Sequence, residues 1–278
     1  MDQPQNNSPT LDPSEADLSS VDSVTIDQIP GRKPGRILKL RDAEIYFERF
    51  GAGKPVLLLH GGAATIESWF CQIPALAEKY ELIVPDARGH GRSPDVDGPI
   101  DFDSMAADFC ELLDHVGLKN VAVVGWSDGA VTGMKMAMMR PDLISKVVTL
   151  GAHSRPEGMT DDFRAEVEGS TAENFPEILS GGYKALSPDG PDHWPVVFGK
   201  LKTMWLTLPD FSEGELQSIQ CPVLLVVGES DIVTREESKR MESLIPDASL
   251  KILEGASHYA PVEVPEIVNA VVLDFIDI

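Results

Sequence analysis

The feature that most constrains this chain is a turn built around Ser127. Residues 121–124 form an apolar, mostly β-branched run, which is the pattern of a strand buried on both faces. The segment Gly125–Gly129 follows with the pattern Gly-x-Ser-x-Gly, and residues 130–139 have the composition of a buried helix. Glycine at both ends leaves room for a strained turn, because a β-carbon there would collide with neighbouring backbone. The pattern predicts that Ser127 projects from the end of a strand, with the positive N-terminus of a helix behind it.

Strand patterns alternate with helix patterns through most of the chain. The expected strands are residues 36–40, 43–49, 55–60, 81–85, 121–124, 146–150, 222–228 and 248–253, and the expected helices are residues 66–79, 103–116, 130–139, 234–245 and 264–275. This alternation predicts an α/β fold with a mostly parallel eight-stranded sheet and helices on both of its faces. The first two strands alternate in polarity and are expected to pair antiparallel.

The alternation breaks over residues 152–218, which are rich in proline and aromatic residues and contain no obvious buried strand. We interpret this segment as a helical cap, or lid, inserted between the two parts of an α/β core, residues 31–151 and 219–278. Residues 1–30 contain no Lys or Arg and no large apolar cluster. They are predicted to be a flexible acidic tail, because they cannot bury enough surface to offset the entropy of ordering.

Composition limits the partners of this chain. The formal net charge of −22 makes nucleic acids and anionic membrane surfaces unlikely partners. No apolar run is long enough to span a membrane, and the N-terminus lacks the basic and apolar regions of a secretory signal. The three cysteines, Cys71, Cys110 and Cys221, form no disulfide framework and are expected to be free thiols in a reducing compartment. These features favour a cytoplasmic protein, and they leave its oligomeric state open.

An aspartate and a histidine follow two of the later predicted strands. Asp231 comes just after the strand that ends at Gly228, and His258 comes just after the strand at residues 248–253. In open α/β sheets, functional residues lie at the carboxyl ends of the strands. The chain order Ser127, Asp231, His258 is that of a serine triad. We expect His258 to act as the base for Ser127 and Asp231 to hold the imidazole tautomer. Glu229 is the competing acid.

Two backbone amides are candidates for stabilising a tetrahedral oxyanion. One is the N–H of Asp128, the residue after the expected nucleophile, and the other is the N–H of Gly62 in the segment His60-Gly61-Gly62. Each such donor is typically worth about 10²–10³ in rate. The sequence contains neither a metal-ligand spacing nor a glycine-rich phosphate loop, so we expect no metal and no cofactor.

Together these motifs resemble those of the α/β-hydrolase fold superfamily, over roughly residues 36–278. They are His60-Gly61-Gly62, Asp86-x-Arg88-Gly89-x-Gly91-x-Ser93, Gly125-Trp126-Ser127-Asp128-Gly129, Asp231 and His258. The Gly-Trp-Ser-Asp-Gly segment is similar to that of valacyclovir hydrolase-like (biphenyl hydrolase-like) serine esterases. That resemblance implies that the Asp128 side chain helps to hold the α-amino group of amino-acid esters. The alternative is that Asp128 is a helix N-terminal acid that complements the helix dipole.

The motifs predict a serine hydrolase that cleaves small carboxylic esters or lactones through an acyl-enzyme. We expect the substrate to contact Trp126, Asp128, His153, Trp194 and Trp205. Within the same fold, the alternatives are an α-aminoacyl ester hydrolase, an amidase or peptidase, a C–C bond hydrolase and a cofactor-free perhydrolase. A non-catalytic receptor for a small ligand is the alternative of another class.

Overall fold

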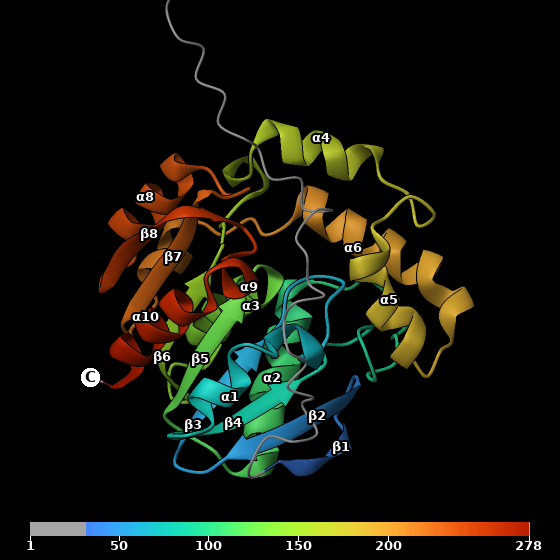
Figure 1. Ribbon diagram of the computed structural model, residues 1–278, viewed down its shortest axis with the longest axis horizontal. Coiled ribbons are helices and arrows are strands. Elements are labelled where there is room, and N and C mark those ends of the chain that lie inside the picture. Colours follow the sequence, from blue (N-terminus) through green and yellow to red (C-terminus); the bar gives the residue numbers. More distant parts are fainter. Residues whose placement is uncertain (1–31, 278) are drawn as a thin grey trace, which may run out of the picture.

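The structure is a computed structural model, and it describes residues 32–277. The tail predicted at residues 1–30 lies outside the described residues. Figure 1 shows a central sheet with helices on both faces. The strands are β1 (Lys33–Lys39), β2 (Glu44–Gly51), β3 (Lys54–Leu59), β4 (Tyr80–Pro85), β5 (Val121–Trp126), β6 (Ile144–Leu150), β7 (Val223–Ser230) and β8 (Ala248–Ser257).

The eight strands form one sheet in the order β1-β2-β4-β3-β5-β6-β7-β8. β2 pairs antiparallel with both β1 and β4, and all the other neighbouring strands pair in parallel. The prediction of a mostly parallel eight-stranded α/β sheet is therefore confirmed. The parallel strands direct their carboxyl ends to one edge of the sheet, where the loops after β3, β5, β7 and β8 meet.

Two apolar clusters lie on the two faces of the sheet. One face is covered by α2 (Phe102–Val116), α3 (Asp128–Met139) and α8 (Arg235–Leu244), and the other by α1 (Ile73–Leu76) and α10 (Pro265–Asp277). α9 (Ala260–Glu263) is a short helix between β8 and α10. The side chain of Asp101 accepts a hydrogen bond from the backbone of Ser104 and so caps the start of α2, and Gly117 in the left-handed conformation ends it.

The predicted helix at residues 66–79 is wrong as a single element. The structure has a 3₁₀ helix at Ile66–Trp69 and then, after a turn, the short helix α1. Pro74 accounts for the break, because proline has no N–H for a bond to the preceding turn and its ring clashes with that turn. The apolar periodicity of this segment is real, since Ile66, Trp69 and Ile73 are all buried.

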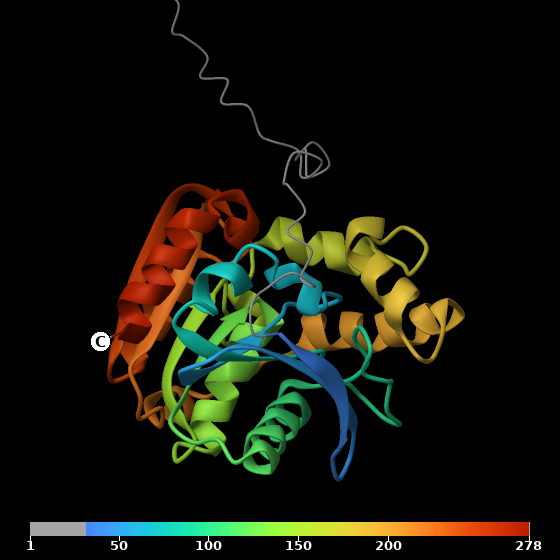
Figure 2. The ribbon, with the colours of Figure 1, turned by 60° about the horizontal axis from the view of Figure 1, so that its bottom comes forward.

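The chain between β6 and β7 contains helices and turns rather than sheet strands. We call residues 151–222 the helical insert; the segment predicted as a cap, residues 152–218, lies within it. Its helices are α4 (Asp161–Gly169), α5 (Glu177–Leu186), α6 (Trp194–Thr207) and α7 (Glu213–Gln217). Figures 1 and 2 show α4, α5 and α6 grouped beside the sheet and helices of the core. Within the described residues, no helix is long and apolar enough to cross a membrane.

Candidate active site

Ser127 lies in the turn between β5 and α3, at φ 54° and ψ −116°. A positive φ is strained for a residue with a side chain, so the surrounding packing must enforce it. A β-carbon on Gly125 would lie 2.2 Å from the carbonyl oxygen of Gly129, and a β-carbon on Gly129 would lie 2.0 Å from that of Leu59. The turn can therefore be this tight only with glycine at both positions.

The loops after β7 and β8 bring Asp231 and His258 together. Nδ1 of His258 lies 2.7 Å from Oδ1 of Asp231, and both side chains are largely buried. The Asp231 carboxylate also accepts hydrogen bonds from the backbone N–H groups of Gly228 and Val233, each at 3.1 Å. Gly151, at the end of β6, makes room for the pair, because a β-carbon there would lie 2.6 Å from the imidazole ring.

The pKa of Asp231 lies below its ordinary value. Burial alone would raise the pKa, but the positive charge of His258 and the hydrogen bonds from the imidazole and the two backbone amides outweigh burial. Glu229, the competing acid in the sequence, is exposed and accepts a hydrogen bond from the backbone N–H of Gly255 at 3.0 Å. The carboxylate that contacts His258 is therefore that of Asp231.

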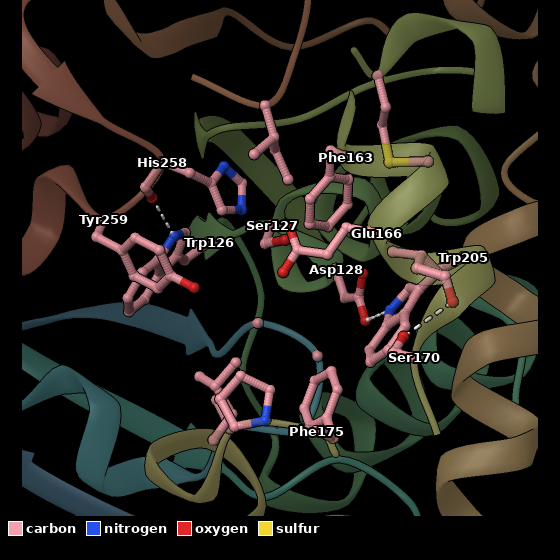
Figure 3. A pocket seen from close by; sticks show the side chains of 18 of the residues that line it. Trp126, Ser127, Asp128, Phe163, Glu166, Ser170, Phe175, Trp205, His258 and Tyr259 are labelled. Carbon is pink, nitrogen blue, oxygen red and sulfur yellow. Dashed lines mark hydrogen bonds between the residues drawn. The ribbon is translucent and has the colours of Figure 1, made fainter. Parts of the chain in front are cut away.

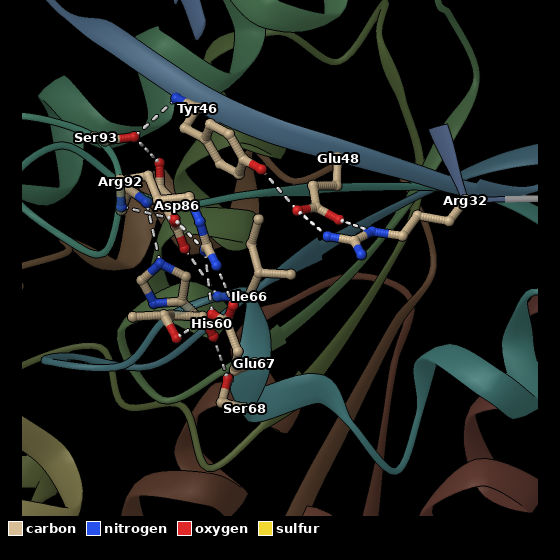
Figure 4. Close-up of polar contacts among 12 residues, drawn as sticks. Arg32, Tyr46, Glu48, His60, Ile66, Glu67, Ser68, Asp86, Arg92 and Ser93 are labelled. Carbon is tan, nitrogen blue, oxygen red and sulfur yellow. Dashed lines mark hydrogen bonds and ion pairs between the residues drawn. The ribbon is translucent and has the colours of Figure 1, made fainter. Parts of the chain in front are cut away.

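The loop at residues 60–66 is tied at both ends to the segment that follows β4, as Figure 4 shows. Near its start, Nε2 of His60 accepts a hydrogen bond from the backbone N–H of Ala87 at 3.0 Å. At its end, Oδ1 of Asp86 accepts a hydrogen bond from the backbone N–H of Ile66 at 2.9 Å. Gly62 lies between these two hydrogen bonds, so the contacts with residues 86 and 87 help to fix the position of its N–H.

Burial controls the protonation of the two side chains that accept these hydrogen bonds, His60 and Asp86. It lowers the pKa of His60 to about 3, so the imidazole is neutral near pH 7 and can accept through Nε2. Burial raises the pKa of Asp86 to about 6 against the opposing effect of its backbone hydrogen bonds. Arg92 lies beside Asp86 and pairs with Glu67, and it also covers the ring of Tyr46 at 5.0 Å. This cluster holds the loop against the edge of the sheet.

Asp128 is the first residue of α3, and its side chain faces the helical insert. Its Oδ2 accepts a hydrogen bond from Nε1 of Trp205 in α6 at 2.8 Å. Only 6% of Asp128 is exposed, and burial raises the pKa of its carboxyl group to about 6, although the Trp205 bond and the His258 charge oppose this shift. A β-carbon on Gly62 would lie 2.3 Å from Oδ2 of Asp128, so Gly62 also makes room for this carboxylate.

A cavity of about 370 Å³ opens beside Ser127, between the core and the insert. Figure 3 shows Ser127, Asp128 and His258 facing side chains of the insert across it. The walls are mainly aromatic and aliphatic, and include Trp126, Phe163, Phe175, Trp205, Ile232 and Tyr259. Within residues 32–277, no group of three or more His, Cys, Asp or Glu side chains is arranged to hold a metal ion. The cavity therefore pairs an apolar binding space with Ser127, His258 and two carboxylates, Asp128 and Glu166.

Comparison with known proteins agrees with this geometry. The family described as alpha/beta hydrolase fold matches residues 54–185. A non-heme haloperoxidase of Rhodococcus erythropolis is 28% identical over 263 residues, which are 84% of this chain and 96% of the relative. A non-heme chloroperoxidase of Streptomyces lividans is 26% identical and covers 87% of this chain and 99% of its own. A thermophilic esterase from Thermogutta terrifontis superposes with a TM-score of 0.70 at 25% identity, over 88% of this chain and 98% of its own.

The chain has the α/β-hydrolase fold. The resemblance noted from the sequence is thereby confirmed at the level of the superfamily. The narrower resemblance to valacyclovir hydrolase-like esterases stays a prediction.

Four of the five side chains expected to contact substrate line the cavity of this α/β-hydrolase: Trp126, Asp128, His153 and Trp205. Trp194 does not. It is 2% exposed, packs against Tyr183, Phe175 and Phe198, and donates from Nε1 to the carbonyl of Ala172 at 3.1 Å. The expectation for Trp194 is therefore wrong, because this ring belongs to the apolar core of the insert.

His153 lines the cavity as a neutral side chain. Burial lowers its pKa to about 4, against the opposing charge of Glu237. Its Nε2 has no hydrogen-bond partner among the described residues and is itself buried. His153 is therefore part of the wall of the α/β-hydrolase cavity, with its Nε2 buried.

Sequence reasoning missed two notable residues of the wall, Glu166 and Tyr259. Tyr259 directly follows His258, and its ring stands edge-on to that of Trp126 at 6.1 Å, so its place next to the expected base was a usable signal. Glu166 lies on the exposed, acidic helix α4, whose sequence does not distinguish a carboxylate that faces the cavity from one that faces water.

Proposed function

We propose that this α/β-hydrolase is a cofactor-independent serine hydrolase that cleaves small carboxylic esters or lactones through an acyl-enzyme on Ser127. The observation that carries the proposal is the 2.7 Å contact between His258 and Asp231 at the cavity that also contains Ser127 in its strained turn. A base held by a buried carboxylate, beside a serine at a helix N-terminus, is the arrangement needed to activate a hydroxyl group. The relatives named above include an esterase, which supports this reaction class.

The reaction would proceed in two halves. Oγ of Ser127 attacks the ester carbonyl carbon while Nε2 of His258 takes the hydroxyl proton. The tetrahedral oxyanion accepts hydrogen bonds from the backbone N–H groups of Asp128 and Gly62. When the intermediate collapses, the C–O bond to the alcohol breaks and His258 gives its proton to the leaving oxygen. Water then attacks the acyl-enzyme by the same route, which releases the acid and restores Ser127.

The buried carboxylate of Asp231 has a defined task in this scheme. It accepts from Nδ1–H of His258, which leaves Nε2 free to take the serine proton, and its negative charge stabilises the imidazolium that forms. The low pKa of Asp231 keeps it ionised for this purpose near neutral pH. Two further backbone donors fix the carboxylate in place, so the imidazole is oriented before substrate binds.

Hydrolysis of a p-nitrophenyl ester of a short fatty acid tests the proposal. Rapid mixing should give a burst of p-nitrophenol followed by steady turnover, because with this activated leaving group the acyl-enzyme forms faster than it is hydrolysed. Ser127→Ala should abolish both phases while the circular dichroism spectrum stays that of the wild type. Binding without any release of p-nitrophenol would instead support a non-catalytic receptor of the same fold.

Two alternatives use the same residues. The haloperoxidase and chloroperoxidase relatives favour a perhydrolase, in which hydrogen peroxide instead of water attacks the acyl-enzyme and a peracid leaves. The position of Asp128 favours an α-aminoacyl ester hydrolase, in which its carboxylate would hold the substrate ammonium group.

The expected partner is a small ester-type molecule. No nucleic-acid or membrane partner is expected, and the cytoplasmic location also stays a prediction from the sequence.

A further inference from the structure

The wall of the cavity beside Ser127 carries negative charge without positive charge. Two carboxylates line it, Asp128 at the start of α3 and Glu166 on α4 of the helical insert. Of the described residues that line the cavity, none is a lysine or an arginine. The wall therefore offers a substrate carboxylate no cation with which to pair.

Glu166 is the more exposed of the two carboxylates. Figure 3 shows its side chain reaching from the insert toward Ser127 and Asp128. The basic residue of the same helix, Arg164, lies 3.8 Å from Asp161 and does not neutralise Glu166. The charge of Glu166 also acts on the opposite wall: burial first, and then the Glu166 and Glu263 carboxylates, raise the pKa of the Tyr259 hydroxyl. Its charge therefore faces the space that the substrate must enter.

Three hydrogen-bond donors of the wall are already used within the protein. Nε1 of Trp126 donates to the carbonyl of His258 at 2.9 Å, and Nε1 of Trp205 donates to Asp128 at 2.8 Å. The hydroxyl of Ser170 donates to the carbonyl of Val167 at 2.8 Å. An anionic substituent beside these three groups would thus lose water without gaining a hydrogen bond from them, which is unfavourable even before repulsion is counted.

We propose that Glu166 is a specificity-determining residue, which makes this site reject substrates that carry a carboxylate and accept neutral or cationic esters. The inference rests on the proposed function, because it concerns the substrate class of the same site. Like charges placed close together across a binding surface are strongly unfavourable, and the net charge of −22 adds a field of the same sign. Anionic keto-acids and half-esters of dicarboxylic acids are therefore outside the substrate class.

Three p-nitrophenyl esters of similar length test this inference: the hexanoate, the adipate half-ester and the 5-(trimethylammonio)pentanoate. The wild-type protein should cleave the adipate ester with a kcat/KM at least about tenfold below that of the hexanoate, and the cationic ester at least as well as the hexanoate. Glu166→Lys should raise the adipate-to-hexanoate ratio by about tenfold or more, and Glu166→Gln should raise it by less. Loss of folded protein would lower both rates together and leave this ratio unchanged.

Glu168→Lys is the matched control, because Glu168 is exposed on the same helix and does not line the cavity. It makes the same change in net charge and should leave the ratio as in the wild type. Equal cleavage of the three esters by the wild type would overturn the inference and leave the proposed function standing. The inference would also be overturned if Glu168→Lys raised the adipate-to-hexanoate ratio as much as Glu166→Lys does. Failure to cleave any of the three esters would refute the proposed function and this inference together.

Discussion

Asp231 and Asp128 are both buried carboxylates of the candidate active site, yet their surroundings push their pKa values in opposite directions. Asp231 accepts from an imidazole and two backbone amides, and its pKa is lowered. Asp128 accepts from the indole of Trp205, and burial raises its pKa to about 6. The comparison teaches that burial alone does not decide the charge of a carboxylate, because the number and charge of its donors do.

The two positions also differ in where their donors come from. Those of Asp231 belong to β7, to its own loop and to the loop after β8, so they are fixed by the core of the α/β-hydrolase. The donor of Asp128 belongs to α6 of the helical insert, where Trp205 stacks on Phe175 at 5.8 Å. Asp231 is therefore suited to orienting the catalytic base, which the core alone can do. Asp128 is suited to substrate binding, which depends on the helical insert.

The largest effect is expected at Asp231. Asp231→Asn keeps the size of the side chain but favours the wrong imidazole tautomer, and it should lower kcat by about 10⁴, as the same change does in serine proteases of the Ser-His-Asp type. Asp128→Asn keeps the backbone donor and should change kcat on neutral esters by less than about tenfold. Steady-state kinetics on p-nitrophenyl hexanoate checks both values. Equal losses in the two variants would remove the distinction between the carboxylates.

The contributions of Asp128 and Asp231 to the unfolding free energy should change with pH in opposite directions. The pKa of Asp128 rises from 3.8 to about 6 on folding, so between these values the folded state holds a proton that the unfolded chain has lost. Its contribution to stability therefore falls as pH rises through that window. Two pKa units correspond to about 3 kcal/mol. The unfolding free energy of Asp128→Asn, measured relative to that of the wild type, should therefore rise by about this amount between pH 4 and pH 7.

Asp231 should behave in the reverse way. Because folding lowers its pKa, it contributes stability that is present above the unfolded pKa and is lost as pH falls through the folded pKa. The deficit of Asp231→Asn relative to the wild type should therefore be largest at pH 7 and shrink as the pH falls to 4 and below. Urea titrations of the three proteins across this range measure both trends. Trends of the same sign in the two variants would contradict the assignment of the shifts.

Most of the fold could be predicted because it follows from local pattern. Buried parallel strands are continuous apolar runs, and the loops at their carboxyl ends held Ser127, Asp231 and His258. The helix predicted at residues 66–79 does not form as one element, because Pro74 interrupts an otherwise regular apolar period. The pattern of a helix is averaged over many residues, whereas one proline is enough to end it.

The contacts of the helical insert could not be predicted, because they join residues far apart in the chain. Nothing local shows that Trp205 meets Asp128, or that Trp194 packs inside the insert while Trp205, in the same helix, lines the cavity. Glu166 could not be predicted either, because the sequence of an exposed acidic helix does not show which of its carboxylates faces the cavity. Such choices are made by tertiary packing, which a single sequence does not display.

The measurement that tests the central claim most directly is the mapping of a fluorophosphonate adduct by peptide mass spectrometry. The reagent phosphonylates a serine that has been activated as a nucleophile, and the adduct is stable. We expect one adduct per chain, on Ser127. It should form at a similar rate in the wild type and Asp128→Asn, form much more slowly in Asp231→Asn, and be absent from Ser127→Ala. An adduct on another serine, or labelling of Asp231→Asn as fast as the wild type, would contradict the central claim.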